Sequence, residues 1–252
     1  MISRNELKRL AETKGLPIES AEKDYLLDLL LYNICGESGD KLVFKGGTSL
    51  YKFFSLNRFS EDLDFTLNSR RFDAEGFAGK LRRRLASIGI DAGAAEIDET
   101  GNEANIVFNI RGPLYDGGKR SLCRIALNIS KRERIIKDPK PELLVPSSRE
   151  IPSFQVFVMD EREIMAEKVR AIMTREKPRD LYDLWFLLKR GVKPDKGMID
   201  AKLKLYGKKF SKEKFAKSVE AKKASWETDL RGLVMGPLVD FKLARDEALK
   251  QF

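Results

Sequence analysis

The chain has 252 residues, of which 42% are hydrophobic, so it can form one large domain or two small ones with a genuine core. It contains no histidine, which excludes an imidazole general base and an imidazole metal ligand. Any catalysis must therefore use carboxylates, lysine, hydroxyl groups or a metal ion held by oxygen atoms. The formal net charge of +9 favours polyanionic partners such as nucleic acids or nucleotides.

The N-terminal stretch MISRNELKRLAETKG predicts a polar helix rather than a signal peptide. No apolar run approaches the length that crosses a membrane. A second helix is predicted from Ser20 to about Ile34, with Ser20 as its N-cap. Cys35 and Cys123 lie too far apart for a metal-ligand spacing, and we expect reduced thiols in a cytoplasmic protein.

The segment LVFKGGTSLYKFF predicts a short strand, a Gly-Gly turn and a helix. Gly46 and Gly47 would let the backbone approach a phosphate closely. Thr48 and Ser49 would open the helix, whose free N–H groups and positive dipole end favour an anion, and Lys52 adds charge. A lone Gly-Gly pair is more often just a turn that needs glycine.

Residues 59–67 alternate like a strand. The alternation places Leu63 and Phe65 toward a core, and Asp62 and Asp64 on the opposite face. Neighbouring carboxylates repel unless a positive group holds them. This pair suits Mg²⁺, with Mn²⁺ as an alternative, shared with substrate phosphates. A solvent-facing acidic strand is the competing interpretation when the pair is taken alone.

The remaining elements continue the alternation of helices and strands and then become helical. Arg82, Arg83 and Arg84 form a run, solvated or phosphate-facing, in a helix predicted over 74–88. Prolines between Pro139 and Pro152 suggest a connector. The other predictions are an antiparallel strand pair at 104–110 and 122–130, a strand at 154–159, and helices at 161–175, 180–190, 196–206, 211–223 and 226–250.

This order predicts an α+β fold. A mixed sheet flanked by helices would occupy residues 1–158, and a helical domain would occupy residues 159–252. We expect the active site in the cleft between the two domains.

A second set of charged residues lies in the helical part. Lys168 falls inside the apolar stripe of its helix, so it needs a partner, either a structural ion pair or a triphosphate. Asp180 and Asp183 share one face of the next helix. If that face is buried, each acid must pair with a base or contact a substrate. The candidate partners are Lys168, Arg175, Lys177 and Arg179.

FKGGTSLYK followed by RFSEDLDF resembles the signature of the DNA polymerase β-like nucleotidyltransferase superfamily, GG[ST] and then DxD. The closer resemblance is to the AbiEii/AbiGii toxin family of nucleotidyltransferases. That family's pattern adds an upstream segment, here Glu22-Lys23-Asp24-Tyr25, and a downstream lysine helix with an RDxxD helix, here EKVRAIMTREKPRDLYDLWFLL. Four motifs in this order cover roughly residues 21–188.

The resemblance implies an Mg²⁺-dependent nucleotidyltransferase toxin that transfers a nucleoside monophosphate from an NTP to an acceptor hydroxyl. It implies tRNA as the acceptor, a toxin–antitoxin or phage-defence system, and a cognate antitoxin. Lys168 and Asp183 would be active-site residues, with Asp180 as the competing choice, and Asp183 would act as a base or orient the lysine. The other assignments are Gly46, Gly47, Thr48 and Ser49 around the triphosphate, Asp62 and Asp64 on the metal, and Lys52, Arg58 and Lys168 on phosphates.

The chain departs from the superfamily at a third carboxylate, expected on the strand at 122–130. Asn128 stands there, and an amide can ligate a metal but brings no charge and is no base. Two alternatives stay open: an inactive relative that binds nucleic acid or a partner, and a small-molecule nucleotidyltransferase. We also expect Thr48 and Ser49 to be exposed hydroxyls that a kinase-type antitoxin could phosphorylate.

Overall fold

The computed structural model describes residues 1–93 and 95–252, and the chain divides into two compact units. The first unit holds residues 1–49, 61–132 and 140–158, and the second holds residues 50–60, 133–139 and 159–252. Two short segments of the predicted first domain, residues 1–158, therefore group with the C-terminal helices. A boundary between residues 158 and 159 stays a prediction.

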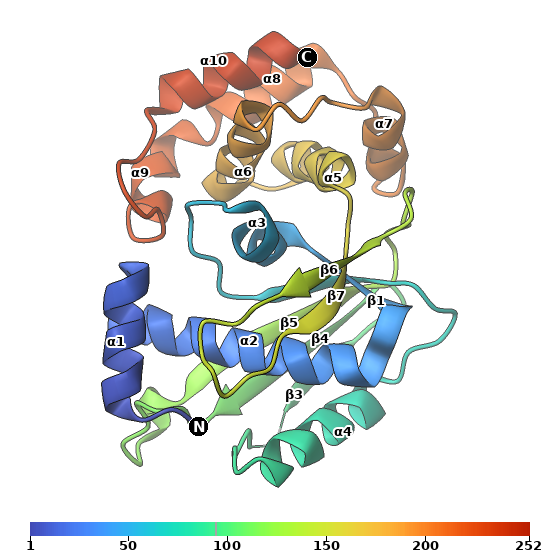
Figure 1. Cartoon of the computed structure of the whole chain (residues 1–252). Coiled ribbons are helices and arrows are strands. Elements are labelled where there is room, and N and C mark those ends of the chain that lie inside the picture. The colour runs from blue at the N-terminus through green and yellow to red at the C-terminus, as the bar shows by residue number, and fades with distance from the viewer. Residues whose placement is uncertain (94) are drawn as a thin grey trace. The chain divides into compact units, whose positions relative to one another are not determined.

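The described part of the first unit contains a seven-stranded mixed sheet with the order β3-β4-β5-β2-β1-β7-β6 (Figure 1). Strand β2 pairs antiparallel with β1 and parallel with β5. Strands β4 and β5 form the predicted antiparallel pair. The strands are β1 (Leu42–Lys45), β2 (Leu63–Leu67), β3 (Glu96–Glu99), β4 (Glu103–Ile110), β5 (Cys123–Ser130), β6 (Lys140–Leu144) and β7 (Phe154–Val158).

Helices pack on this sheet as the alternating pattern of the sequence predicts, so the α+β fold is confirmed. α2 and α4 contact each other and the sheet (Figure 1). α2 begins two residues before the predicted Ser20, directly after Pro17, because proline's fixed φ suits the start of a helix. The helices of the first unit are α1 (Arg4–Lys14), α2 (Ile18–Ser38) and α4 (Ala74–Ser87). Helix α3 spans Gly46–Phe54, and only its first residues, up to Ser49, belong to the first unit.

Two details of the sheet differ from the sequence prediction. Strands β3 and β6 were not predicted, and β6 lies inside the proline-rich connector. It is an edge strand, where the missing N–H of Pro141 is tolerated. Strand β2 begins at Leu63 rather than residue 59, because the N–H of Phe59 bonds instead to the carbonyl of Leu233, at 2.8 Å, within the second unit.

The second unit is helical. α5 packs against α6, α7 and α8, and α6 also contacts α9 and α10. The single helix predicted over 226–250 is wrong, since Gly236 and Pro237 lie between α9 and α10 and proline cannot continue a helix. The helices are α5 (Glu161–Thr174), α6 (Pro178–Lys189), α7 (Lys196–Lys204), α8 (Lys212–Glu220), α9 (Trp226–Leu230) and α10 (Phe241–Gln251). Across residues 1–93 and 95–252, no helix is both long and apolar enough to span a membrane.

A buried lysine joins three parts of the second unit. Lys202 of α7 is fully buried, and its Nζ lies 2.9 Å from Glu163, 2.9 Å from Glu167 and 3.3 Å from Glu133. It also donates to the carbonyl of Arg134 at 2.7 Å. Burial alone would disfavour the charged form, but the three carboxylates raise the pKa of Lys202 above its ordinary value.

Replacing Lys202 with methionine should destabilise the protein by about 3–5 kcal/mol, because three buried carboxylates would lose their shared cation. The urea midpoint of unfolding measures this. Lys204→Met, at an exposed position of the same helix, is the control and should change the midpoint little. Equal midpoints for the two variants would show that the carboxylate cluster contributes nothing.

Candidate active site

The first unit places Asp64 against the backbone of Gly46. Gly46 has φ +78° and opens α3 directly after β1. A Cβ at this position would lie 2.5 Å from Asp64 Oδ2 and 3.0 Å from Asp64 Cβ, closer than atoms pack. Glycine is therefore needed twice, for its left-handed backbone and for the space that the carboxylate occupies.

Asn128 holds the same carboxylate from the other side. β2 and β5 run parallel with Asp64 opposite Asn128, and the Asn128 amide donates to Asp64 Oδ1 at 3.0 Å. Asp62 and Asp64 are both half-buried and flank the buried Leu63. The observed contact therefore joins one carboxylate to one amide, and Asp62 lies one residue before β2 begins. The described residues contain no group of three or more acidic or cysteine side chains placed to hold a metal ion.

The first turn of α3 begins at Gly46, two residues earlier than predicted. Thr48 and Ser49 are therefore fully buried inside a packed helical turn, and the expectation of exposed hydroxyls is wrong. The hydroxyl of Thr48 donates to the carbonyl of Asp62, which joins this turn to the start of β2. Ser49 Oγ has no hydrogen-bond partner in the described structure, a rare state for a buried polar atom.

The Glu22–Tyr25 motif lies on α2 and bonds α2 to other segments of the first unit. Glu22 accepts from the N–H of Leu114 at 2.6 Å, and burial raises its pKa. Lys23 pairs with Glu61 at 3.0 Å, next to Asp62. Asp24 pairs with Lys14, and the Tyr25 hydroxyl contacts Glu150 at 3.3 Å. These contacts hold α2 against its neighbours and are therefore positioning contacts.

In the second unit, Asp183 is held by two cations. Arg58 is 1% exposed and donates to both carboxylate oxygens of Asp183, with Nε–Oδ1 and Nη2–Oδ2 at 2.9 Å. Its Nη1 donates to the carbonyl of Phe59. Lys168 Nζ lies 2.7 Å from Asp183 Oδ2. All three nitrogens of Arg58 are thus engaged within the protein, and its predicted phosphate contact stays a prediction.

Asp180 completes the same buried network. Lys168 Nζ lies 3.3 Å from its Oδ1, and Arg175 donates to both of its oxygens at 2.7 and 2.9 Å. Burial opposes ionisation of Asp180, but the Lys168 ammonium and the Arg175 guanidinium outweigh it and hold the pKa of Asp180 well below its usual range. Among the predicted partners, Lys168 and Arg175 make these contacts.

Lys52 is half-buried, with its Nζ 5.4 Å from the centre of the Tyr51 ring. This is the distance of a cation–π contact. The ring orients a cation on the last turn of α3 without removing its charge. The assignment of Lys52 to a phosphate stays a prediction.

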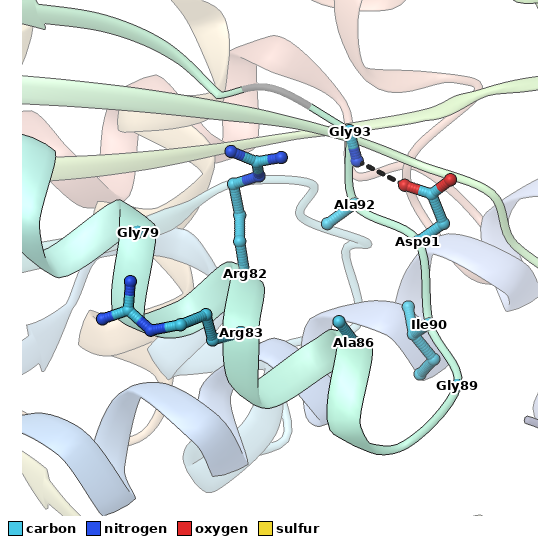
Figure 2. A pocket seen from close by; sticks show the side chains of 9 residues that line it. All are labelled: Gly79, Arg82, Arg83, Ala86, Gly89, Ile90, Asp91, Ala92 and Gly93. Atoms are coloured by element: carbon cyan, nitrogen blue, oxygen red, sulfur yellow. Dashed lines mark hydrogen bonds between the residues drawn. The ribbon is translucent and has the colours of Figure 1, made fainter.

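The three arginines of the run on α4, Arg82, Arg83 and Arg84, lie in two different environments. Arg84 donates to Asn33 at 3.3 Å, whereas Arg82 and Arg83 are exposed and line a hollow of about 440 Å³ at the end of α4. Figure 2 shows their guanidinium groups extending in different directions, beside a turn closed by the Gly93 N–H bond to Asp91 at 2.9 Å. None of the predicted site residues lines this hollow.

Sequence reasoning named the network's residues but missed the pair between Arg58 and Asp183, which are separated by 125 positions. No local pattern identifies such a pair. A weak signal did exist, because an arginine between the apolar pair Leu56 and Phe59 has to satisfy its charge internally when that segment is buried.

Gly46→Ala should destabilise the protein more than Gly15→Ala. Both glycines have positive φ, +78° and +62°, but no atom lies within 4 Å of a Cβ added at Gly15. Gly15→Ala should therefore cost only the backbone strain, about 1–2 kcal/mol, while Gly46→Ala also displaces Asp64. Free energies of unfolding in urea measure the difference. Equal losses would mean that the close approach of Asp64 does not constrain residue 46.

Asp180→Asn should lower stability by about 3 kcal/mol at pH 7 by unbalancing a buried ion network. Because the pKa of Asp180 is lowered in the folded protein, its stabilising effect is complete above the ordinary pKa of aspartate, about 3.9, and is lost as the pH falls through the lowered value. The gap between wild type and variant should therefore shrink below about pH 4.

Thermal or urea unfolding from pH 7 to pH 2.5 measures this gap. Asp200→Asn, at an exposed position of α7, serves as the control and should show no such pH-dependent gap. A gap for Asp180→Asn that stays constant down to the lowest pH would contradict the assignment.

Solved structures that resemble this fold include the following three. MenT4, a nucleotidyltransferase toxin from Mycobacterium tuberculosis H37Rv, has a TM-score of 0.66 and 21% identity, with 100% of this chain and 89% of that chain covered. JHP933 from Helicobacter pylori has a TM-score of 0.59 and 21% identity, covering 94% and 91%. A putative nucleotidyltransferase from H. pylori has a TM-score of 0.61 and 20% identity, covering 94% of both chains. At these identities the likeness establishes the fold.

No curated protein matches the sequence. The family model described as "Nucleotidyl transferase AbiEii toxin, Type IV TA system" matches residues 29–249, which is most of the chain and includes Gly46, Asp64, Lys168 and Asp183. The resemblance inferred from the four motifs is thereby confirmed, and the chain belongs to the AbiEii family of nucleotidyl transferase toxins.

Proposed function

We propose that this toxin transfers a nucleoside monophosphate from an NTP to a hydroxyl group of an RNA acceptor, with tRNA as the acceptor class. The observation that carries the proposal is Asp64, which lies against the Gly46 backbone and accepts a hydrogen bond from Asn128. A carboxylate fixed beside the first turn of a helix is an arrangement suited to nucleotide phosphates and their cation.

The helix start supplies part of the phosphate binding. α3 has nine residues, and the N–H groups of its first turn have no partner within the helix. With the positive end of the helix dipole, they favour a negatively charged ligand. The buried, unpartnered Ser49 hydroxyl is one further polar group of this turn that a bound ligand or water would satisfy.

The donor set fits a hard divalent cation. Mg²⁺ is commonly held by one or two carboxylates and completes its shell with water and substrate phosphates, so Asp62 and Asp64 suffice as protein ligands. Asn128 contributes an amide that already orients Asp64. When bound, Mg²⁺, or Mn²⁺ in its place, would neutralise the negative charge that develops on the phosphates.

In the proposed transfer, the acceptor oxygen forms a bond to the α-phosphorus and the bond to the β-phosphate oxygen breaks, so that pyrophosphate leaves. The acceptor hydroxyl also releases its proton. Asn128 cannot accept that proton because an amide is not a base. Because Asp62 and Asp64 are assigned to the cation, which favours their ionised form, the proton passes to water.

The residues of the second unit have roles that follow from the family resemblance. Of the two roles open for Asp183, its buried, bidentate pairing with Arg58 favours orientation of Lys168 over proton abstraction. Both carboxylate oxygens of Asp183 are already engaged by Arg58 and Lys168, which leaves neither free to reach a substrate proton. We assign phosphate contacts to Lys168 and Lys52, and a positioning role to Arg58 and Asp180.

Family membership supports a further part of the proposal. As a type IV toxin family member, the protein would act with a cognate antitoxin, in a setting such as phage defence. The burial of Thr48 and Ser49 disfavours an antitoxin that phosphorylates these hydroxyls in the folded protein.

Incubation with labelled NTPs, Mg²⁺ and total tRNA tests the transfer. The wild type should label RNA, and Asp64→Ala should lower the rate about 100-fold or more, because several kcal/mol of charge stabilisation is lost. Asp98→Ala, at an exposed position of β3, should be unaffected. Labelling of a small acceptor instead of RNA would identify the small-molecule alternative.

The substitution Asn128→Asp distinguishes the two hypotheses, an active enzyme and an inactive relative. If Asn128 serves to hold Asp64, Asn128→Asp should lower transfer, since a donated hydrogen bond is replaced by like-charge repulsion. If Asn128 instead marks the loss of a third catalytic carboxylate, the wild type should bind RNA without transfer, and Asn128→Asp should gain activity. That second result would contradict the proposed function.

A further inference from the structure

Positive charge is concentrated in one short part of the second unit. We call residues 203–221 the lysine segment. It holds six lysines, two glutamates and no arginine or aspartate, a net charge of +4 within a chain of net charge +9. The six lysines are all exposed: Lys204, Lys208, Lys209, Lys212, Lys214 and Lys217.

Buried lysines hold both ends of this segment. At one end, Lys202 lies among the carboxylates of Glu133, Glu163 and Glu167. At the other, Lys222 donates to the carbonyls of Ile172 and Arg175, at 3.1 and 2.6 Å, at the end of α5. The segment between them is thus fixed to the helices of the second unit.

Aromatic packing holds the middle of the lysine segment in place. Phe210 and Phe215 stack against each other and against Phe252, with ring centres 4.9 to 5.7 Å apart. Within α8, Phe215 and Val219 are buried. Helical periodicity places Lys214 and Lys217 on the opposite side, three residues apart. The lysines therefore project from an ordered turn and helix.

Nothing in the described protein neutralises these charges. None of the six lysines has a carboxylate within ion-pair distance across residues 1–93 and 95–252, and Glu220 pairs instead with Arg245, at 3.0 Å. Clustered like charges repel and destabilise a fold. A surface built this way is stabilised when it binds a polyanion.

The surface fits a nucleic acid better than a protein. Protein–protein interfaces are enriched in aromatic and apolar side chains and depleted in lysine. The large hydrophobic side chains that are exposed on the described chain lie elsewhere, none of them in residues 203–221. Six exposed lysines without an exposed large hydrophobic side chain among them match the repeated charge of a phosphodiester backbone.

We propose that the lysine segment binds the phosphate backbone of the RNA acceptor, without reading its base sequence. This inference rests on the proposed function, because it assigns the site that holds the acceptor. It concerns binding alone, so it can be tested without nucleotide.

The test compares two variants that each lose four exposed charges. One replaces Lys208, Lys209, Lys214 and Lys217 with alanine, and the control replaces Lys8, Arg9, Lys119 and Arg120, four exposed residues of the first unit, with alanine. Fluorescence anisotropy measures the affinity for a labelled RNA oligonucleotide, without NTP, between 50 and 200 mM salt. Circular dichroism checks that both variants unfold like the wild type.

The lysine variant should bind RNA about tenfold or more weakly at 100 mM salt, and its slope of log affinity against log salt should fall by roughly 3, since each phosphate contact contributes about 0.7–0.9. The control should stay within about threefold of the wild type, because its charges would contact no phosphate. Equal losses in both variants would indicate a general charge effect and overturn the inference. So would competition by polyglutamate, at equal charge, as effective as competition by RNA.

The two proposals fail in different ways. RNA binding that depends on the lysine segment, with no transfer by the wild type, would refute the proposed function and support the binding site. Transfer to tRNA with an unchanged KM for tRNA in the lysine variant would refute the binding site and support the function.

Discussion

The close approach of a carboxylate to a backbone is the constraint on which the candidate site depends. Asp64 occupies the space that any side chain at position 46 would need. The strand–helix joint must therefore carry glycine there, and the helix must begin at that residue. Thr48 then reaches the carbonyl of Asp62, so the helix start and the acidic strand form one rigid piece.

Asn128 belongs to this piece rather than merely standing in for a missing acid. Parallel pairing of β2 with β5 puts its amide opposite Asp64, and the bond between them fixes the orientation of the carboxylate. A third carboxylate at this position would repel Asp64 unless a cation were bound. The amide thus keeps the site ordered without a metal, at the loss of one candidate base.

In the second unit, buried charges are stabilised by ion pairs with oppositely charged side chains. Some of its cations pair with acids that are themselves buried, whereas the six lysines of residues 203–221 are exposed and have no carboxylate within ion-pair distance in the described residues. Lys168, Arg58 and Arg175 share two aspartates, and Lys202 shares three glutamates. Because each buried charge is compensated, the helices pack closely, and the surplus positive charge is left on the surface, where a polyanionic ligand can meet it.

The sequence by itself determined the α+β class, the β4–β5 pair, the family and the residues of the candidate site, because glycine, alternating acids and apolar stripes act through local geometry. The missed strand β6 and the break between α9 and α10 are local errors, caused by a proline in an edge strand and a proline after Gly236. Only the tertiary structure decided the burial of Thr48 and Ser49 and the pairs Asp64–Asn128 and Arg58–Asp183. These depend on segments 64 and 125 positions apart, and no local pattern encodes which distant side chain will neutralise a buried charge.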